Sequence, residues 1–211
     1  GRSDPMGRRI RRSSRPRPER RTVLLVTNGG RTEKTYLGKL KGRVPRDANL
    51  SIMVICQEGK EPETILRNLV RGETDLRAYD ETWIVVDHDG ADRRDFLIQC
   101  GKVSKDFGSR VVGVVSVPCF EVWLNAHYEQ VQNYRDQKDA QRHYERLTGL
   151  SGRSAKDLPG DFPLDRAVEA ETRCTLRGTS VPEKNTQGPC PSTTMPHLLK
   201  RLGLTTGRAA R

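Results

Sequence analysis

Four short, almost continuously apolar runs alternate with amphipathic segments, and this alternation constrains the fold more than any other feature. The runs are Val23–Val26, Leu50–Ile55, Trp83–Val86 and Val111–Val117. Strands without polar alternation are buried on both faces, as in parallel sheets. With helices between them, the runs predict an α/β fold built on a mainly parallel four-stranded sheet flanked by helices.

The segments between the apolar runs have the spacing of amphipathic helices. We expect Thr32 to cap the first helix and Pro62 to begin the second. Apolar residues between Phe96 and Phe107 recur at helical spacing and predict a third helix with a buried face. Each helix would return the chain to the start of the next parallel strand.

After the fourth strand the chain becomes more polar, and its pattern predicts helices. They are expected at Phe120–Tyr128, Lys138–Leu147, Leu164–Leu176 and His197–Leu202. Residues 177–192 are rich in Gly, Pro, Ser and Thr and predict a long loop. Because loops of this length are usually functional or disordered, we expect this one to cover the site or a partner-binding face.

These patterns divide the chain into segments. Residues 21–130 are expected to form the α/β core, and residues 131–203 a C-terminal helical addition packed on it. Residues 1–20 predict a basic disordered arm, of which residues 1–5 resemble a remnant of cloning. Residues 204–211 predict a tail.

The charge of the chain points to a polyanionic partner. Lys and Arg total 38 against 27 acidic residues, a formal net charge of +11. The excess is concentrated in residues 8–21, which are dense in arginine and hold a single acid, Glu19. Such a run is commonly a solvated arm, and it also suits the phosphates of nucleic acid. The charge therefore favours nucleic acid as a partner, without sequence specificity.

Several classes of protein do not fit the sequence. No apolar stretch approaches the roughly 20 residues that span a bilayer, and the basic N-terminus lacks the apolar region of a secretory signal. The five cysteines form no CxxC pair, which argues against disulfides and zinc and favours a reducing, cytoplasmic location. The phosphate-binding loop motif of nucleotide hydrolases does not occur, so we expect no nucleotide hydrolysis by the chain alone.

Asp87 and Asp89 are the strongest candidates for a metal site. They follow the third apolar run, and strand alternation would place both carboxylates on one side, with His88 facing away. Ligands of open α/β sheets bind beyond the carboxyl ends of the strands, where both residues are expected. Two carboxylates with water suit Mg²⁺ or Mn²⁺. The structural alternative is that Asp87 caps the next helix and Asp89 serves a turn.

The turn after the first strand is a candidate phosphate-binding site. Asn28, Gly29 and Gly30 would present backbone N–H groups at the start of a helix, an arrangement that favours anions. Arg31 and Lys34 flank the turn, and the fork of Arg31 suits two phosphate oxygens. A plain glycine turn joining strand to helix is the alternative.

Further candidates follow the fourth strand. Glu121 and Ser116 are expected near the same edge of the sheet, and His127 lies one helical turn beyond Trp123. Phe120 and Trp123 fit a core role better than base stacking, and His127 fits a structural role better than that of a general base. Glu121 and His127 are therefore accessory candidates.

Four motifs stand in a distinctive order along the chain. They are Asn28-Gly29-Gly30-Arg31-Thr32-Glu33-x-x-Tyr36, Asp87-x-Asp89, Ser116-x-Pro118-x-Phe120-Glu121-x-Trp123-x-x-x-His127 and Pro191-Ser192-Thr193-Thr194. This order resembles the RloB-like family, which includes the Toprim-type subunit of AbiL-like abortive-infection systems. The resemblance extends over about residues 21–203.

The resemblance implies a Toprim core of Rossmann-like type, metal-dependent nuclease chemistry, a role in bacterial defence against phage and a companion ATPase. It assigns metal binding to Asp87 and Asp89. The usual family pattern is Glu-Gly-x-x-Thr-Glu, and Asn28 stands at its first position here. Either Glu33, the second acid, supplies the third carboxylate, or Asn28 contributes a neutral oxygen, or the site is weakened.

Three interpretations of the function remain. The first is a Mg²⁺- or Mn²⁺-dependent nuclease, with Arg31 or Lys34 offsetting charge in the transition state. The second is a nucleic-acid-binding or sensing subunit without turnover, which Asn28 favours. The third is nucleotidyl transfer or primase-like chemistry. Ser192 and Thr193 are accessory candidates because hydroxyls before a helix can receive a phosphate. DNA, messenger RNA and tRNA are alternative substrates, and self-association is left open.

Overall fold

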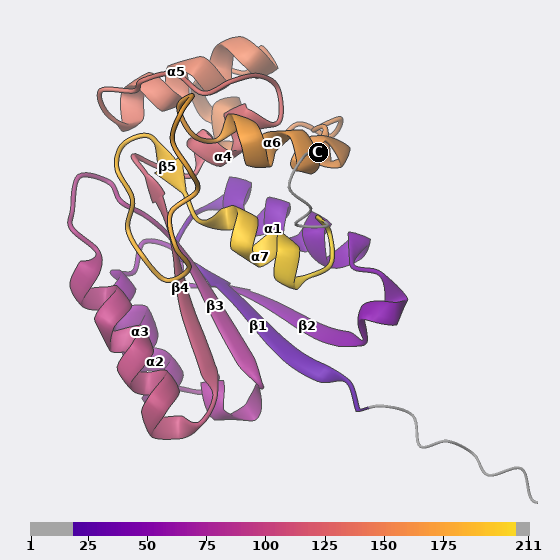
Figure 1. Cartoon of the computed structure of the whole chain (residues 1–211), viewed down its shortest axis with the longest axis vertical. Coiled ribbons are helices and arrows are strands. Elements are labelled where there is room, and N and C mark those ends of the chain that lie inside the picture. Colours follow the sequence, from indigo (N-terminus) through magenta and orange to yellow (C-terminus); the bar gives the residue numbers. More distant parts are fainter. Residues whose placement is uncertain (1–18, 206–211) are drawn as a thin grey trace, which may run out of the picture.

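The computed structural model of the chain describes residues 19–205 (Figure 1). Most of the predicted basic arm and of the predicted tail lie outside the described residues. The described part is an α/β structure in which helices cover both faces of a twisted sheet (Figure 1). The predicted Rossmann-like arrangement is thereby confirmed.

The sheet has five strands in the order β2-β1-β3-β4-β5. They are β1 (Arg21–Thr27), β2 (Leu50–Cys56), β3 (Glu81–Asp87), β4 (Arg110–Val117) and β5 (Ser192–Thr193). The first four strands are parallel, as predicted, and β5 pairs antiparallel with the end of β4. The sequence did not indicate β5, because two residues are too few for a strand period to be recognised.

Seven helices belong to the described residues. They are α1 (Arg31–Arg43), α2 (Pro62–Arg71), α3 (Arg94–Phe107), α4 (Glu121–Ala126), α5 (Gln137–Thr148), α6 (Ala167–Arg173) and α7 (Met195–Arg201). Helices α1 and α7 cover one face of the sheet, and α2 and α3 cover the other (Figure 1). Helices α4, α5 and α6 lie beyond the carboxyl ends of the parallel strands (Figure 1).

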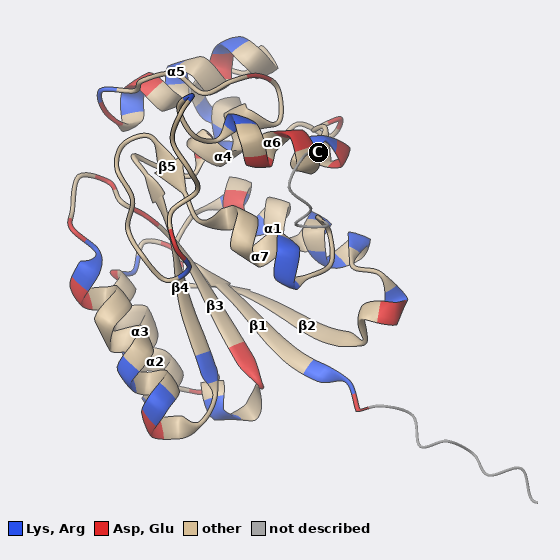
Figure 2. Ribbon diagram, in the orientation of Figure 1, with Lys and Arg blue, Asp and Glu red and all other residues tan. Residues whose placement is uncertain are grey.

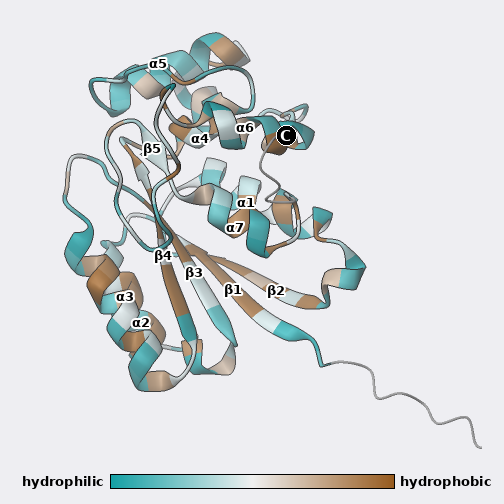
Figure 3. Ribbon diagram, viewed as in Figure 1, coloured by the Kyte–Doolittle hydropathy of each residue, from teal (hydrophilic) through white to brown (hydrophobic). Residues whose placement is uncertain are grey.

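Side chains of the parallel strands alternate between two hydrophobic layers, as the pleat of a strand requires. Leu25 packs with Val23 and Trp83 on the α1 face, in a layer that joins both halves of the chain. Leu24 and Ile84 pack with α2 and α3 on the other face. Much of the strand surface has the colour of hydrophobic residues in Figure 3. Charged residues lie on helices, loops and strand ends (Figure 2).

Two predictions about helix residues were wrong. Thr32 does not cap α1, which has Gly30 at its N-cap, and its hydroxyl instead donates a hydrogen bond to the carbonyl of Lys156. Phe107 is not buried but 38% exposed, because it lies at the last position of α3. The Arg77 guanidinium lies over its ring, 5.4 Å from the centroid. The role of Thr32 is set by a tertiary contact with Lys156, whereas the exposure of Phe107 follows from its place at the end of α3.

The predicted helix at Leu164–Leu176 is shorter than expected. It consists of a 3₁₀ turn at Leu164–Arg166 followed by α6, which ends at Arg173. The carbonyl of Arg173 accepts the N–H of Val131 at 3.0 Å. A carbonyl of the last turn is thus occupied by a distant segment, and the helix ends before Leu176, its expected last residue.

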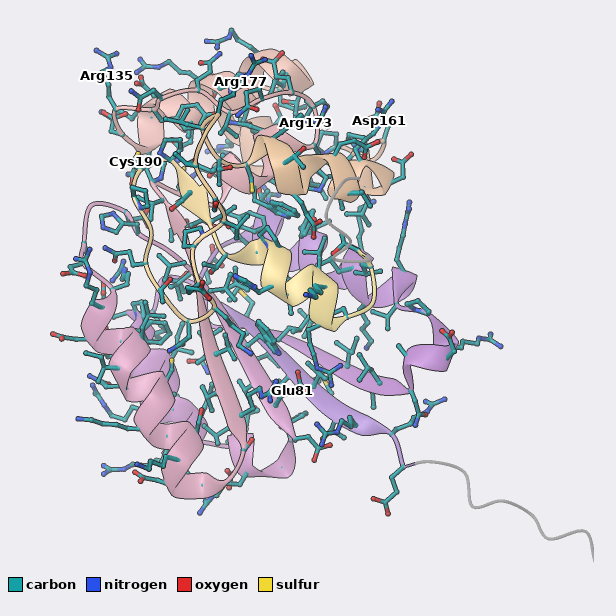
Figure 4. The ribbon with its side chains drawn as sticks, in the orientation of Figure 1. Glu81, Arg135, Asp161, Arg173, Arg177 and Cys190 are labelled. Carbon is teal, nitrogen blue, oxygen red and sulfur yellow. The ribbon has the colours of Figure 1, made fainter. Side chains whose placement is uncertain are left out.

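A buried ion pair fastens α7 to the amino end of β3. The Glu81 side chain is 2% exposed, and Arg201 donates to both of its carboxylate oxygens at 2.7 to 3.0 Å. Trp83 Nε1 donates to the same carboxylate at 2.9 Å. Glu81 lies toward the end of the sheet remote from α5 and α6 (Figure 4). The pair therefore serves packing at the edge opposite the candidate site.

The strand order creates a topological switch point between β1 and β3. From β1 the chain crosses through α1 to β2 on one side, whereas from β3 it crosses through α3 to β4 on the other side. The connections after β1 and β3 therefore diverge at the carboxyl edge of the sheet. Ligands of open α/β sheets bind at such points.

Candidate functional site

Every parallel strand is followed by an acidic residue at the carboxyl edge of the sheet. Glu33 follows β1, Glu58 follows β2, Asp87 ends β3 and Glu121 follows β4. Asp89 follows Asp87 by two positions. Because the carboxyl ends of parallel strands share one edge, the fold gathers acids that are far apart in the sequence.

The two aspartates of the Asp87-x-Asp89 motif are held by a turn and not by strand alternation. Strand β3 ends at Asp87, and Asp89 has a φ of 51°, in the left-handed region. The Asp89 N–H donates to the Pro118 carbonyl at 3.0 Å, and Asp87 Oδ1 accepts the Phe120 N–H at 2.8 Å. Both residues are thus fastened to the segment that follows β4. The expectation that strand geometry aligns them was wrong, because the strand ends before it reaches Asp89.

The carboxyl groups at this edge raise one another's pKa. Burial, followed by the charges of Glu121, Asp89 and Glu58, raises the pKa of Glu33 to about 8. Burial and then Glu33 and Glu121 hold the pKa of Asp87 well above its usual range. The pKa values of Glu121 and Asp89 are raised too, in both cases chiefly by burial. Such mutual repulsion indicates an excess of negative charge that a cation would offset.

Glu33 occupies a position that the glycine turn makes possible. It lies in the first turn of α1 with 9% of its surface exposed. A Cβ atom on Gly29 would collide with the carboxyl carbon of Glu33, so a side chain at that position would displace the carboxylate. A Cβ on Gly30 would lie 3.3 Å from Glu58 Oε1. The two glycines therefore leave room for the side chains of Glu33 and Glu58, whether or not the turn also binds a phosphate.

The donor chemistry of this group suits a hard divalent cation. Carboxylate oxygens are the ligands that Mg²⁺ and Mn²⁺ prefer, and Glu33, Asp87, Asp89 and Glu121 supply them. Within residues 19–205, no three His, Cys, Asp or Glu side chains are gathered closely enough to hold one ion. Binding of a shared cation would therefore require these side chains to turn toward one another.

Two of the predicted phosphate-binding residues, Asn28 and Arg31, have protein partners in the structure. The Asn28 amide donates to the Lys60 carbonyl at 3.3 Å and so braces the connection after β2. Arg31 Nε lies 3.1 Å from Asp157 Oδ1 in an ion pair whose side chains are both well exposed. Lys34 is exposed. Because an exposed ion pair contributes little, a phosphate could take the place of Asp157 on Arg31.

Arg93 is a buried cation beside the acidic group, and no motif in the sequence had singled it out. Its side chain is 8% exposed, Nε donates to the Asp87 carbonyl at 3.0 Å, and Nη1 lies 3.3 Å from Glu61 Oε2. Its charge lowers the pKa of Asp89 and so opposes the larger effect of burial. The sequence offered one signal for this role, because Arg93 is a basic residue that follows the Asp87-x-Asp89 motif closely.

His127 lies in the core and not among the carboxylates. Its Nδ1 is 2.8 Å from the Trp123 carbonyl, and its Nε2 is 3.1 Å from the Tyr36 hydroxyl. That hydroxyl also accepts a hydrogen bond from Trp123 Nε1 at 2.7 Å. Burial lowers the pKa of His127 to about 4, so the ring is neutral near pH 7. Both ring nitrogens have protein partners, as expected of a structural histidine.

The long loop between α6 and β5 closes the edge of the sheet beside the site. Asn185 Oδ1 accepts the N–H of Gly113 in β4 at 2.8 Å. Gln187 Oε1 accepts the N–H of Arg93 at 2.7 Å. The loop therefore gives a hydrogen-bond partner to a backbone N–H at the edge of β4. It also binds the backbone at the start of α3.

The accessory candidates Ser192 and Thr193 form β5. Thr193 pairs with Ser116, which in turn pairs with Asp87 across β4 and β3. The hydroxyls of Thr193 and Ser116 hydrogen-bond to each other at 2.8 Å. Ser192 Oγ is buried and has no hydrogen-bond partner among the described residues. Both residues lie on the same edge as Asp87, but their hydroxyls are enclosed in the sheet.

Of three comparisons with known proteins, the one with family models gives a match. A family model described as RloB-like protein matches residues 23–202. No curated protein and no solved structure matches the chain. As for membrane association, none of the helices found in residues 19–205 has both the length and the apolar character needed to cross a bilayer.

Proposed function

The chain belongs to the RloB-like family, and we propose that it is a metal-dependent nuclease that hydrolyses phosphodiester bonds of DNA or RNA. The observation that carries the proposal is the set of carboxyl groups that separate connections bring to the topological switch point, with Glu33 buried among them. Glu33 is buried, Asp87 and Glu121 are half-buried and Asp89 is exposed. Nucleases that use metal ions need such a concentration of oxygen ligands at an accessible edge.

The proposed roles follow from the surroundings of each residue. Asp87 and Asp89 would hold Mg²⁺ or Mn²⁺, with Glu33 and Glu121 completing the oxygen ligands. A bound ion would supply charge stabilisation for the phosphate and lower the pKa of a water molecule. In the free protein Glu33 keeps its proton near neutral pH, because its pKa is about 8. Cation binding is therefore expected to release protons.

Substrate binding would involve the cations around the acidic group. Arg31 would exchange the carboxylate of Asp157 for a phosphate of the nucleic acid, and its planar fork would orient that phosphate. Lys34, one turn along α1, would add a second positive charge. Arg93 is enclosed by protein, so we assign it to holding the Asp87 main chain in place.

A cleavage assay tests the proposal directly. Labelled single-stranded DNA, RNA and tRNA would be incubated with the protein and either Mg²⁺ or Mn²⁺. We expect cleavage of at least one substrate and its loss in Glu33→Gln and Asp89→Asn, because each variant removes a charged oxygen ligand of the proposed ion. Glu73→Gln, an exposed acid remote from the site, serves as the control. Equal rates in all of these proteins would contradict the assignment.

A second candidate function is nucleic-acid binding or sensing without turnover. Asn28, which stands where the family pattern usually has Glu, favours it, because an amide can neither ionise nor balance the charge of a cation. In the structure this amide braces the Lys60 carbonyl. Nucleic-acid binding without cleavage under any metal condition would support this alternative. In an active protein, Asn28→Ala should lower the rate without abolishing it.

Family membership also leads us to propose a setting for this activity. We propose that the chain acts in bacterial defence against phage together with a companion ATPase. Co-expression with the ATPase encoded next to it, followed by affinity purification and phage plating, tests both statements. We expect co-purification and fewer plaques with the parent protein, and no protection with Asp89→Asn.

A further inference from the structure

A pocket of about 370 Å³ opens beside Asp89. It lies between the connection after β3, the end of β4, the start of α5 and the end of the long loop. Its lining includes His88, Val117, Pro118 and Cys190. Arg135 and Cys190 lie on the same side of the molecule (Figure 4). The volume is at the lower end of the range for small-ligand sites, about 300–1,000 Å³.

The charges around this pocket nearly balance, so it does not favour an anion. Asp89 and Asp136 line it together with Arg135 and Lys138. Arg135 is paired with Asp139, with Nε and Oδ2 at 3.0 Å. Asp136 is occupied as the N-cap of α5, where it accepts the Asp139 N–H at 3.0 Å. Lys138 has no partner among residues 19–205 and is exposed at the rim.

The uncharged part of the lining combines apolar surface with free hydrogen-bonding groups. Val117 and Pro118 supply apolar contact. The Gln137 side-chain amide has no hydrogen-bond partner in the part of the chain that the structure describes, so both its donor and its acceptor are available. His88 Nδ1 accepts the Gly90 N–H at 3.1 Å, which places the proton of the neutral ring on Nε2. This combination suits a flat, uncharged group with apolar faces and polar edges.

We propose that this pocket holds one unpaired nucleobase next to the phosphate that the proposed cation and Arg31 would bind, so that the substrate is single-stranded or locally unpaired. The inference rests on the proposed function, which places a nucleic acid at Asp89. A base within a duplex has both faces stacked and its pairing edge occupied, and it must leave the helix to enter such a pocket. Lys138 would contact a flanking phosphate.

Binding measurements test the proposal without requiring cleavage. Fluorescein-labelled short DNA and RNA strands would be titrated with the protein, in Ca²⁺ and separately in EDTA, and followed by anisotropy. A parallel set of strands would carry a single abasic site at each position, and a blunt duplex would have the same sequence. We expect at least one abasic position to weaken binding by about tenfold, which corresponds to about 1.4 kcal/mol of binding free energy. The duplex should bind more weakly by a similar factor.

Variants assign the effect to the pocket. Gln137→Ala removes the free amide, and Cys190→Trp fills the pocket from its loop side, while Gln99→Ala on the outer side of α3 is the matched control. We expect the first two variants to bind intact and abasic strands equally, and Gln99→Ala to behave as the parent. Circular dichroism checks that each variant is folded.

The outcomes separate this inference from the proposed function. Parent protein that binds strands tightly but equally with and without each base would overturn the nucleobase pocket and leave the nuclease proposal intact. Preference for the duplex would overturn it in the same way. Absence of binding to every strand in both conditions would overturn both.

Discussion

Glu33 lies against the backbone of Gly29, is 9% exposed and is influenced by the charges of Glu121, Asp89 and Glu58. Burial and these charges disfavour its ionised form, and its pKa rises from 4.5 to about 8. The folded protein therefore holds a proton that the unfolded chain releases between these two values. The contribution of this group to stability is present below pH 4.5 and is lost as the pH rises through 8.

Glu33→Gln should remove this dependence. In metal-free protein at pH 8 we expect the variant to exceed the parent in free energy of unfolding by about 2 to 4 kcal/mol, from about 1.4 kcal/mol per pKa unit. At pH 4.5 the two proteins should be nearly equal. Urea unfolding at both pH values measures the difference, with Glu73→Gln as the exposed control. A variant less stable than the parent at pH 8 would show that the carboxylate has a cationic partner.

Among the secondary-structure elements, two polar contacts join segments that are distant in the sequence. Glu81 and Arg201 join β3 to α7, and His127 joins the end of α4 to α1 through Tyr36. In each contact at least one partner is buried: Glu81 in the first, and both His127 and Tyr36 in the second. Removing one partner therefore leaves a polar or charged group without compensation.

Arg201→Met should lower the free energy of unfolding by about 2 to 4 kcal/mol, because the Glu81 carboxylate would keep only the Trp83 N–H as a partner. Lys200→Met, one position away and exposed, should change it by about 0.5 kcal/mol or less. Chemical denaturation of both variants measures the comparison. If Glu81→Met restores stability in the Arg201→Met background, the loss is due to the unpaired charge.

His127→Phe should lower the free energy of unfolding at pH 7 by about 1 to 3 kcal/mol, since the Tyr36 hydroxyl loses a buried partner. The pKa of His127 is lowered from 6.5 to about 4. Its contribution is therefore present above pH 6.5 and lost as the pH falls through 4. The parent should lose more stability than the variant between pH 6.5 and 4. Parallel losses in the two proteins would assign the acid sensitivity to other groups.

For the molecule as a whole, the basic arm is expected to contribute affinity for nucleic acid without specificity. Most of it lies outside the described residues, and its dense arginine content is read from the sequence alone. Deleting residues 8–20 should weaken binding to every sequence and reduce the slope of log affinity against log salt by about 0.7 to 0.9 for each phosphate that the arm neutralises. Titrations at several salt concentrations measure this slope. An unchanged slope would mean that the arm does not bind phosphate.

The four parallel strands, the helices between them and the edge of the sheet at which the candidate site lies follow from the sequence alone. Apolar runs and helical spacing are local patterns, and parallel strands necessarily place their carboxyl ends together. The positions of Asp87, Asp89 and Glu33 in the sequence are therefore sufficient to assign them to one edge. Family membership could be inferred in the same way, from the order of short motifs.

How these residues meet depends on the tertiary fold. Asp89 turns away from the strand because its N–H binds the Pro118 carbonyl, and Arg31 is paired with Asp157, which lies far along the chain. Glu81 and Arg201 are 120 positions apart. The cause is the same in all three cases: backbone geometry repeats over a few residues and is visible in local patterns, whereas hydrogen bonds and ion pairs depend on which distant segment the fold brings within about 3 Å.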